Sequence, residues 1–317
     1  MTRAEIYAEA KKRGALIDLS SRAKWLVRGA DRIRFLNGQV SNDVRKLKPS
    51  EAAIHACVLT AKGKMCGDIF ISAAPDFLRI DAEASLRESL AARLERYIIA
   101  DDVMLEDIND TECLFHVVGV ESGNFTTITP TGDTAVPSKR FGRGGIDFAA
   151  PRELFGSLRE SLSKTFVLVN DEIAEVFRIE AGVPKWGAEL DENTLPHEAE
   201  LYRDAIDFHK GCYVGQEVIS RIKSVGHVNR SLRGFVSDSP LVAGAKLFLA
   251  TASDEEKSIG ELTSAAWSFG LEKWAALGYL KRGFDPAAAR SEPLQIEARG
   301  ADGTFAKVEV RDLPLVR

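Results

Sequence analysis

The fold class is indicated by Ala53–Ile80, AIHACVLTAKGKMCGDIFISAAPDFLRI, in which three apolar runs alternate with two turn sequences. Gly63 and Pro75 mark the turns, and the runs around them have the length and composition of short strands. We therefore predict a strand meander with its strands at Ala53–Leu59, Met65–Ser72 and Phe77–Ile80.

The segment after this meander predicts one packed helix. Glu83–Tyr97 carries Leu86, Leu90 and Leu94 four residues apart, a spacing that places them on one face. We also predict a helix that begins after Asp31, and strands at Ala23–Arg28, Val103–Ile108 and Leu114–Val120. Strands with a single covering helix are typical of an antiparallel sheet of the α+β class.

The rest of the chain divides into a second mixed region and a β-rich end. A loop over 121–145, with room for one hairpin, precedes predicted helices at Glu153–Leu162 and from Ile173 to Ala181. After about Phe235, short apolar runs alternate with turns, which predicts a barrel or sandwich of roughly 80 residues. We predict domains at 1–120, 121–237 and 238–317, and the first two need not be continuous in sequence.

Composition excludes several classes of protein. Of the 317 residues, 45% are apolar and 28% charged, which is typical of folded domains rather than of disordered chains. No apolar run reaches the ~18 residues of a membrane helix, and the charged N-terminus does not resemble a secretory signal. Four scattered cysteines predict neither disulfides nor a metal site, so we expect a reduced, cytoplasmic protein. The net charge of -5 argues against direct nucleic-acid binding.

Common catalytic motifs are absent from the sequence. Gly63-Lys64 is followed by Met65, which breaks the phosphate-loop pattern, and Gly142–Gly145 lacks the spacing of a dinucleotide-binding turn. The sequence contains neither HExxH nor GxSxG. These absences disfavour conventional nucleotide-dependent, zinc-dependent and serine-hydrolase enzymes.

The segment His209–Glu217, HKGCYVGQE, is the most unusual in the chain. Cys212 lies ahead of a predicted helix at Val218–Val225 and close to Lys210, and both features favour a thiolate that is nucleophilic or binds metal. Alternatively, Cys212 is a small buried residue in a tight turn. Between 208 and 234, five basic side chains accompany Glu217 alone, a net +4 that suits an anionic ligand or a solvated helix face.

Several segments resemble the YgfZ/GcvT folate-binding family, which includes the glycine-cleavage T protein. The octapeptide Lys210–Glu217, KGCYVGQE, is similar to the signature of the YgfZ branch. Further similarities follow in order along the chain, in the stretches Asp31–Val44, Leu59–Ile69, Phe177–Leu190, Leu195-Pro196 and Ile259–Arg282.

This resemblance implies a GcvT-like three-domain clover-leaf, with two α+β domains and a C-terminal antiparallel β-barrel around a folate channel. The implied ligand is tetrahydrofolate or a one-carbon derivative. Asn42 would lie beside the pterin, and the carboxylate of Glu180 would accept from its amino and ring N–H groups. Lys210 and Arg230 would bind the glutamate tail of the folate, an expectation that rests on their charge alone.

One departure from the family bears on its chemistry. Where the aminomethyltransferases carry consecutive acidic residues, this chain reads Cys66-Gly67-Asp68, so Asp68 alone could act at the folate. Loss of a carboxylate disfavours one-carbon transfer, whereas Cys212 favours a redox thiol or a transient iron ligand.

The resemblance therefore implies a tetrahydrofolate-binding accessory protein for assembly or repair of 4Fe–4S enzymes, including tRNA-modifying ones. One thiol cannot hold a cluster that usually takes four, so iron–sulfur client or assembly proteins are the expected partners. Three alternatives stay open. They are a tetrahydrofolate-dependent aminomethyltransferase using Asp68, a folate-dependent oxidase or demethylase that needs a flavin, and a binding scaffold in which Cys212 is structural.

Overall fold

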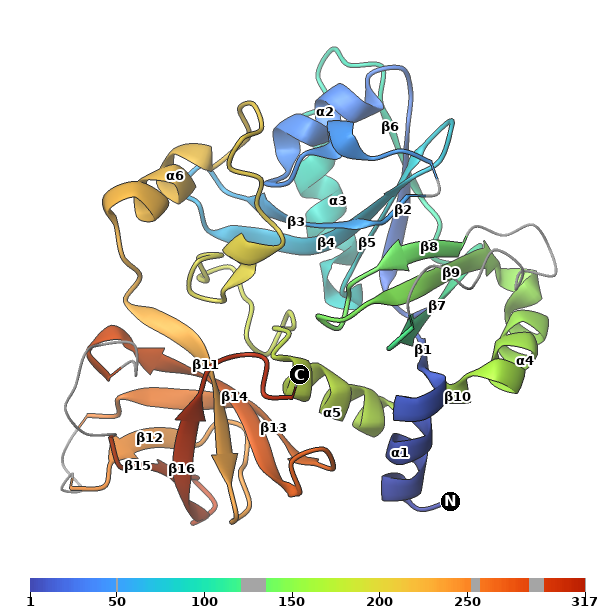
Figure 1. Ribbon diagram of the computed structural model, residues 1–317. Helices are drawn as coiled ribbons and strands as arrows, with labels where there is room; N and C mark the ends of the chain where they lie inside the picture. The colour runs from blue at the N-terminus through green and yellow to red at the C-terminus, as the bar shows by residue number, and fades with distance from the viewer. Residues whose placement is uncertain (50, 121–134, 252–256, 285–293, 317) are drawn as a thin grey trace. The chain divides into compact units, whose positions relative to one another are not determined.

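The computed structural model describes residues 1–49, 51–120, 135–251, 257–284 and 294–316, which fold as two compact units. The first unit comprises Met1–Asp171 and Leu201–Ser220, and the second comprises Glu172–Glu200 and Arg221–Arg317. The first contains two five-stranded sheets, and the second contains a closed barrel (Figure 1).

The β3–β4 sheet of the first unit has the strand order β3-β4-β5-β2-β6, and all its neighbouring strands are antiparallel. Its apolar side chains such as Ile69 and Ile80 are buried, as are Leu90 and Leu94 of helix α3, which contacts β4. Its elements are β2 (Ala23–Arg28), α2 (Arg32–Gln39), β3 (Ile54–Leu59), β4 (Met65–Ala73), β5 (Leu78–Ala82), α3 (Arg87–Glu95) and β6 (Met104–Asp107).

The β7–β9 sheet of the same unit has the order β10-β1-β7-β9-β8, in which only β1 and β10 pair in parallel. Its core is built from Leu16, Phe115 and Phe148 against Leu158 and Leu162. Its elements are α1 (Arg3–Arg13), β1 (Ala15–Asp18), β7 (Glu112–Val118), β8 (Ala135–Ser138), β9 (Gly145–Pro151), α4 (Phe155–Thr165) and β10 (Val167–Leu168).

The second unit is a six-stranded antiparallel barrel that carries helix α5 (Asp171–Ala181). Ile179 of α5 packs with Leu232, Val236 and Leu277 of the barrel. The strands are β11 (Arg230–Ser237), β12 (Lys246–Leu249), β13 (Gly260–Ser268), β14 (Lys273–Lys281), β15 (Ile296–Arg299) and β16 (Phe305–Arg311), closed in the order β11-β14-β13-β12-β15-β16. Helix α6 (Gln216–Val225) precedes β11.

These elements confirm the predicted α+β class and three-part architecture, and they correct details of it. The barrel begins with β11 at Arg230 rather than after 237, and the β7–β9 sheet recruits β1 from the start of the chain. Helix α1 was not predicted; Thr2 caps it, and Glu5 completes a capping box. Of the predicted loop at 121–145, residues 121–134 lie outside the described residues, and β8 forms a hairpin with β9.

Candidate functional site

The loop of residues 204–216, which carries Cys212, is fastened along its length to the segment 37–46. Asn42 Nδ2 donates to the carbonyl of Asp204 at 3.1 Å, and Ser41 Oγ donates to the carbonyl of Ala205 at 2.6 Å. The Asp207 and Val214 amides donate to the carbonyls of Ser41 and Gly38. Contacts at both ends and in the middle leave the 204–216 loop little freedom to change shape.

Lys210 is the central fastening of this loop. Its ammonium is buried and donates to three main-chain carbonyls, those of Asn37 at 2.7 Å, Val40 at 2.6 Å and Asn42 at 2.7 Å. Burial lowers the pKa of Lys210 to about 8, against which the nearby carboxylates of Asp43 and Asp207 favour the charged form. Binding of a glutamate tail by Lys210 stays a prediction, and it would require one of these three bonds to break.

Two glycines bring the end of the loop against the β3–β4 turn. Gly63 and Gly215 both have positive φ, +73° and +87°. A Cβ atom on Gly215 would lie 2.6 Å from the carbonyl oxygen of Thr60, and one on Gly63 would lie 2.9 Å from Val218. Only glycine allows both this backbone conformation and this close approach.

Cys212 is exposed, in contrast to the buried Cys57 and Cys113. Burial raises the pKa of both of those thiols, so they are poor nucleophiles. Cys212 receives less support from nearby positive charge than the sequence indicates. Helix α6 begins only at Gln216, and the effect of its dipole declines within one turn, while the Lys210 ammonium points to carbonyls. The alternative prediction that Cys212 is a small buried residue is wrong, and the reactivity of the Cys212 thiol stays a prediction.

A second group of polar side chains lies on the β3–β4 sheet. Asp68 forms a hydrogen bond with His55 Nε2, and both side chains are mostly buried. Asn42 Nδ2 donates to the carbonyl of His55 at 2.9 Å, and Asn42 Oδ1 accepts from the Asp43 amide. Asn42, His55 and Asp68 therefore form one contiguous cluster, which touches the 204–216 loop through Asn42.

Gly67 faces the side of the sheet opposite to Asp68. A Cβ atom on Gly67 would lie 3.1 Å from Leu90 Cδ1, under helix α3, as expected for a strand whose side chains alternate. A carboxylate at position 67 would be buried among leucines. Its absence therefore removes no charge from the face that carries His55 and Asp68.

We expect Gly67→Asp, which restores the consecutive acidic residues of the transferases, to destabilise the chain by about 2 kcal/mol or more. The atoms nearest to the Cβ of this aspartate would be the side-chain methyl groups of Leu90 and Leu86. Urea unfolding checks this, with Lys62→Asp on the exposed turn as control. A stable Gly67→Asp variant would show that the side chain at 67 can leave the α3 side.

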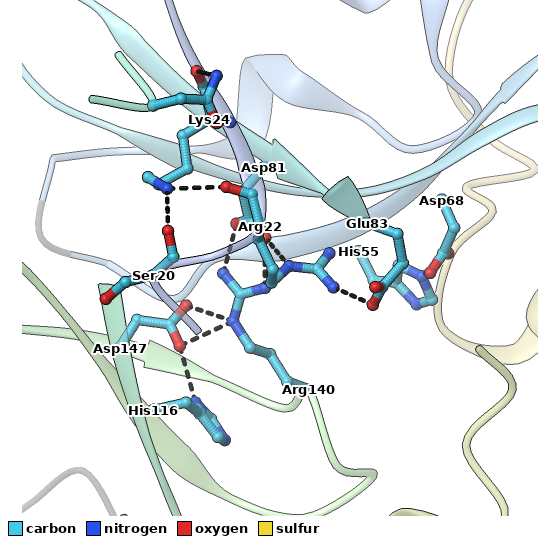
Figure 2. Close-up of polar contacts among 11 residues, drawn as sticks. Ser20, Arg22, Lys24, His55, Asp68, Asp81, Glu83, His116, Arg140 and Asp147 are labelled. Carbon is cyan, nitrogen blue, oxygen red and sulfur yellow. Dashed lines mark hydrogen bonds and ion pairs between the residues drawn. The ribbon is translucent and has the colours of Figure 1, made fainter. Parts of the chain in front are cut away.

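The third group is a buried ion network between the two sheets of the first unit (Figure 2). Arg140 donates to both oxygens of Asp147, at 2.8 and 2.9 Å, and to both oxygens of Asp81, at 2.8 and 2.5 Å. Arg22 bonds to Asp81, and His116 Nδ1 bonds to Asp147 at 2.7 Å. Arg140 thus holds two buried carboxylates together and lowers the pKa of each.

Because of His116, the network predicts that the stability of the fold begins to fall with pH at values above those at which carboxylates ordinarily titrate. Burial lowers the pKa of His116 below its ordinary 6.5, so the unfolded chain binds this proton first. Stability then falls below pH 6.5 by at most about 1.4 kcal/mol per pH unit for such a group. We expect His116→Asn to flatten this slope, measured by urea unfolding between pH 7 and 5, whereas exposed His227→Asn leaves it unchanged. Burial also lowers the pKa of His197 in the second unit, so His197 would keep its own contribution to the slope in the His116→Asn variant.

Glu180 and Arg230 belong to the second unit. Glu180 is buried, and its Oε1 accepts from the Ser268 hydroxyl at 2.6 Å and from the Gly270 amide at 3.1 Å. Arg230 bonds to Glu198 at 3.1 Å and lies over the ring of Tyr279. Asn42, Asp68, Lys210 and Cys212 lie in the first unit, so their predicted common site with Glu180 and Arg230 stays a prediction.

Lys210→Met should destabilise the first unit by about 2 kcal/mol or more, because it leaves three main-chain carbonyls without their donor. Lys46→Met is the matched control, since Lys46, whose own side chain is exposed, fastens the same loop by pairing with Asp207. Chemical unfolding and limited proteolysis within 204–216 check the difference. Equal stability of the two variants would contradict the central role of Lys210.

Within the described residues, no helix is long and apolar enough to cross a membrane. Residues 230–316, which contain the barrel, match the family model of the glycine cleavage T-protein C-terminal barrel domain. Over its full length the fold is similar to a glycine cleavage system aminomethyltransferase T from Bartonella henselae. The TM-score is 0.82 over 99% of this chain and 89% of that one, at 19% identity.

Two curated relatives illustrate the similarity in sequence. An iron-sulfur cluster assembly factor IBA57 homolog, mitochondrial, of Phaeosphaeria nodorum is 27% identical over 68% of this chain and 53% of its own length. A tRNA-modifying protein YgfZ of Sodalis glossinidius is 27% identical over 68% of this chain and 70% of its own. Together, the barrel match, these relatives and the shared fold support a YgfZ/GcvT-like family.

Proposed function

We propose that the chain binds tetrahydrofolate, or a one-carbon derivative of it, and uses the exposed thiol of Cys212 in assembly or repair of 4Fe–4S enzymes, including tRNA-modifying ones. The names of the two curated relatives support the iron–sulfur and tRNA connections. The observation that carries the proposal is the 204–216 loop. It presents Cys212 to solvent and is bonded to Asn42, which belongs to the cluster with His55 and Asp68.

The residues present fit a reduced folate in their chemistry. A 2-amino-4-oxo pterin offers parallel N–H donors, and a carboxylate is the acceptor that matches them. Glu180 supplies such a carboxylate in a buried position, oriented by Ser268 and Gly270. Both ends of the Asn42 amide are bonded to main-chain groups, so Asn42 would support folate binding by holding the 204–216 loop in place. Arg230 stays the proposed partner of the glutamate tail.

The 4Fe–4S cluster itself would be cargo that the protein handles, and not its resident cofactor. Among the described residues, no group of three or more histidine, cysteine or acidic side chains is placed to hold a metal ion. Cys212 would therefore act as a redox thiol or as a transient ligand shared with a client or assembly protein, because a cluster usually takes four thiolates. Iron–sulfur proteins are thus the proposed partners.

Calorimetric titration with tetrahydrofolate under anaerobic conditions tests the proposal. We expect saturable binding by the intact chain, weakened about tenfold by Glu180→Gln, because hydrogen bonds to a charged acceptor contribute roughly 1.5–3 kcal/mol. Exposed Glu192→Gln is the control. Absence of binding by the unaltered chain would contradict the folate proposal. Turnover of methylene-tetrahydrofolate that is lost in Asp68→Asn but survives in Cys212→Ala would favour the aminomethyltransferase instead.

A further inference from the structure

His55 is the polar side chain of the Asn42–His55–Asp68 cluster to which the proposed function gives no task. It lies on β3, directly opposite Phe70 on β4 and diagonal to Asp68. Its side chain is 16% exposed, so solvent reaches part of a ring that is otherwise enclosed. Figure 2 shows the imidazole beside the Asp68 carboxylate.

The bond to Asp68 defines what the other ring nitrogen can do. An ionised carboxylate can only accept, so His55 Nε2 carries the hydrogen in this pair. In the neutral imidazole, Nδ1 is then the acceptor, because the partner of one nitrogen sets the tautomer of the ring. Within the part of the chain that the structure describes, Nδ1 has no hydrogen-bond partner.

The ring is also held firmly in place. It stacks on Phe70 with centroids 4.6 Å apart and an angle of 5° between planes. The Arg140 guanidinium lies 4.3 Å from the Phe70 centroid, and Asp81 and Asp147 fix that guanidinium. Asn42 holds the main chain of His55 through its carbonyl. An acceptor nitrogen that is fixed, oriented and partly accessible is suited to bind a donor on a ligand.

We propose that His55 Nδ1 accepts a hydrogen bond from an N–H group of the bound reduced folate, and that Asp68 is the positioning residue that fixes the tautomer. The inference rests on the proposed function, since a reduced pterin supplies ring N–H donors. It reverses the roles expected from the sequence, in which Asp68 faces the folate. Asp68 acts on the ligand only through the imidazole.

Three substitutions at one position separate this role from simple support of Asp68. Asparagine places its amide near the position of Nδ1, glutamine places its amide near Nε2, and phenylalanine keeps only the stack on Phe70. We expect His55→Gln and His55→Phe to weaken tetrahydrofolate binding at least fivefold, about the loss of one hydrogen bond. His55→Asn should stay within about threefold of the unaltered chain.

The opposite pattern, with His55→Gln binding normally and His55→Asn weakly, would overturn the inference, because His55 would then serve only to hold Asp68. Unchanged binding in all three variants, or equal loss in all three, would overturn it as well. Thermal unfolding of each variant identifies any loss of tetrahydrofolate binding that comes from misfolding. A misfolded variant is replaced by Asp68→Asn, which should weaken binding because it disturbs the tautomer of the His55 ring. If the unaltered chain binds no tetrahydrofolate, the proposed function fails and this inference fails with it, a result distinct from those above.

Discussion

Arg140→Met is expected to destabilise the first unit by about 3–5 kcal/mol, the usual cost of removing one partner of a buried ion pair. The substitution keeps most of the side-chain volume but leaves the carboxylates of Asp81 and Asp147 buried without their shared cation. Arg22 and His116 can compensate only in part, because each contacts one of the two carboxylates. Urea unfolding at neutral pH measures the loss.

A matched control for this variant is Arg28→Met. Arg28 also pairs with one carboxylate, Glu106, and also lies over an aromatic ring, that of Phe77, but its side chain is 36% exposed. Its removal should change stability by no more than about 1 kcal/mol, because exposed pairs contribute little. If Arg140→Met is as mild as Arg28→Met, the buried network does not hold the two sheets together.

Cys212→Ala is expected to abolish function in cells while leaving the fold intact. The thiol is exposed, so its loss should change stability by less than about 0.5 kcal/mol. In a bacterial strain without its own YgfZ-type protein, we expect the variant to restore at least tenfold less of a tRNA modification that depends on a 4Fe–4S enzyme. Nucleoside analysis of bulk tRNA by mass spectrometry measures this.

The control for Cys212→Ala is His209→Ala, an exposed position on the same 204–216 loop. It should restore the modification fully. Full restoration by Cys212→Ala would instead favour the scaffold alternative, in which the loop contributes shape and not chemistry.

The sequence predicts most strands of the β3–β4 sheet because their side chains alternate between a helix-covered core and a polar face. The prediction was less complete where burial does not follow polarity. Lys24 lies in the predicted strand Ala23–Arg28 and is fully buried despite its charge, with its ammonium bonded to the carbonyls of Ser20 and Arg22. Local pattern cannot reveal such a satisfied buried cation, since its partners depend on the turn before the strand.

The candidate site was predictable only as separate residues. The family resemblance singled out Asp68, but the partner His55 is defined by the register of β3 on β4, a diagonal relation that the sequence does not display. Arg140 lies in a predicted loop, and its two aspartates come from strands of different sheets. Lys210 was predicted as a ligand from its charge, whereas its three bonds to main-chain carbonyls appear only in the folded loop.

The claim that a reduced folate and the Cys212 thiol share one site is tested most directly by alkylation of the intact chain, with and without saturating tetrahydrofolate. Peptide mass mapping would follow Cys212 separately from Cys66 and from the buried Cys57 and Cys113. The account predicts that tetrahydrofolate slows alkylation of Cys212 at least fivefold. Saturable binding of tetrahydrofolate with an unchanged alkylation rate at Cys212 would contradict it.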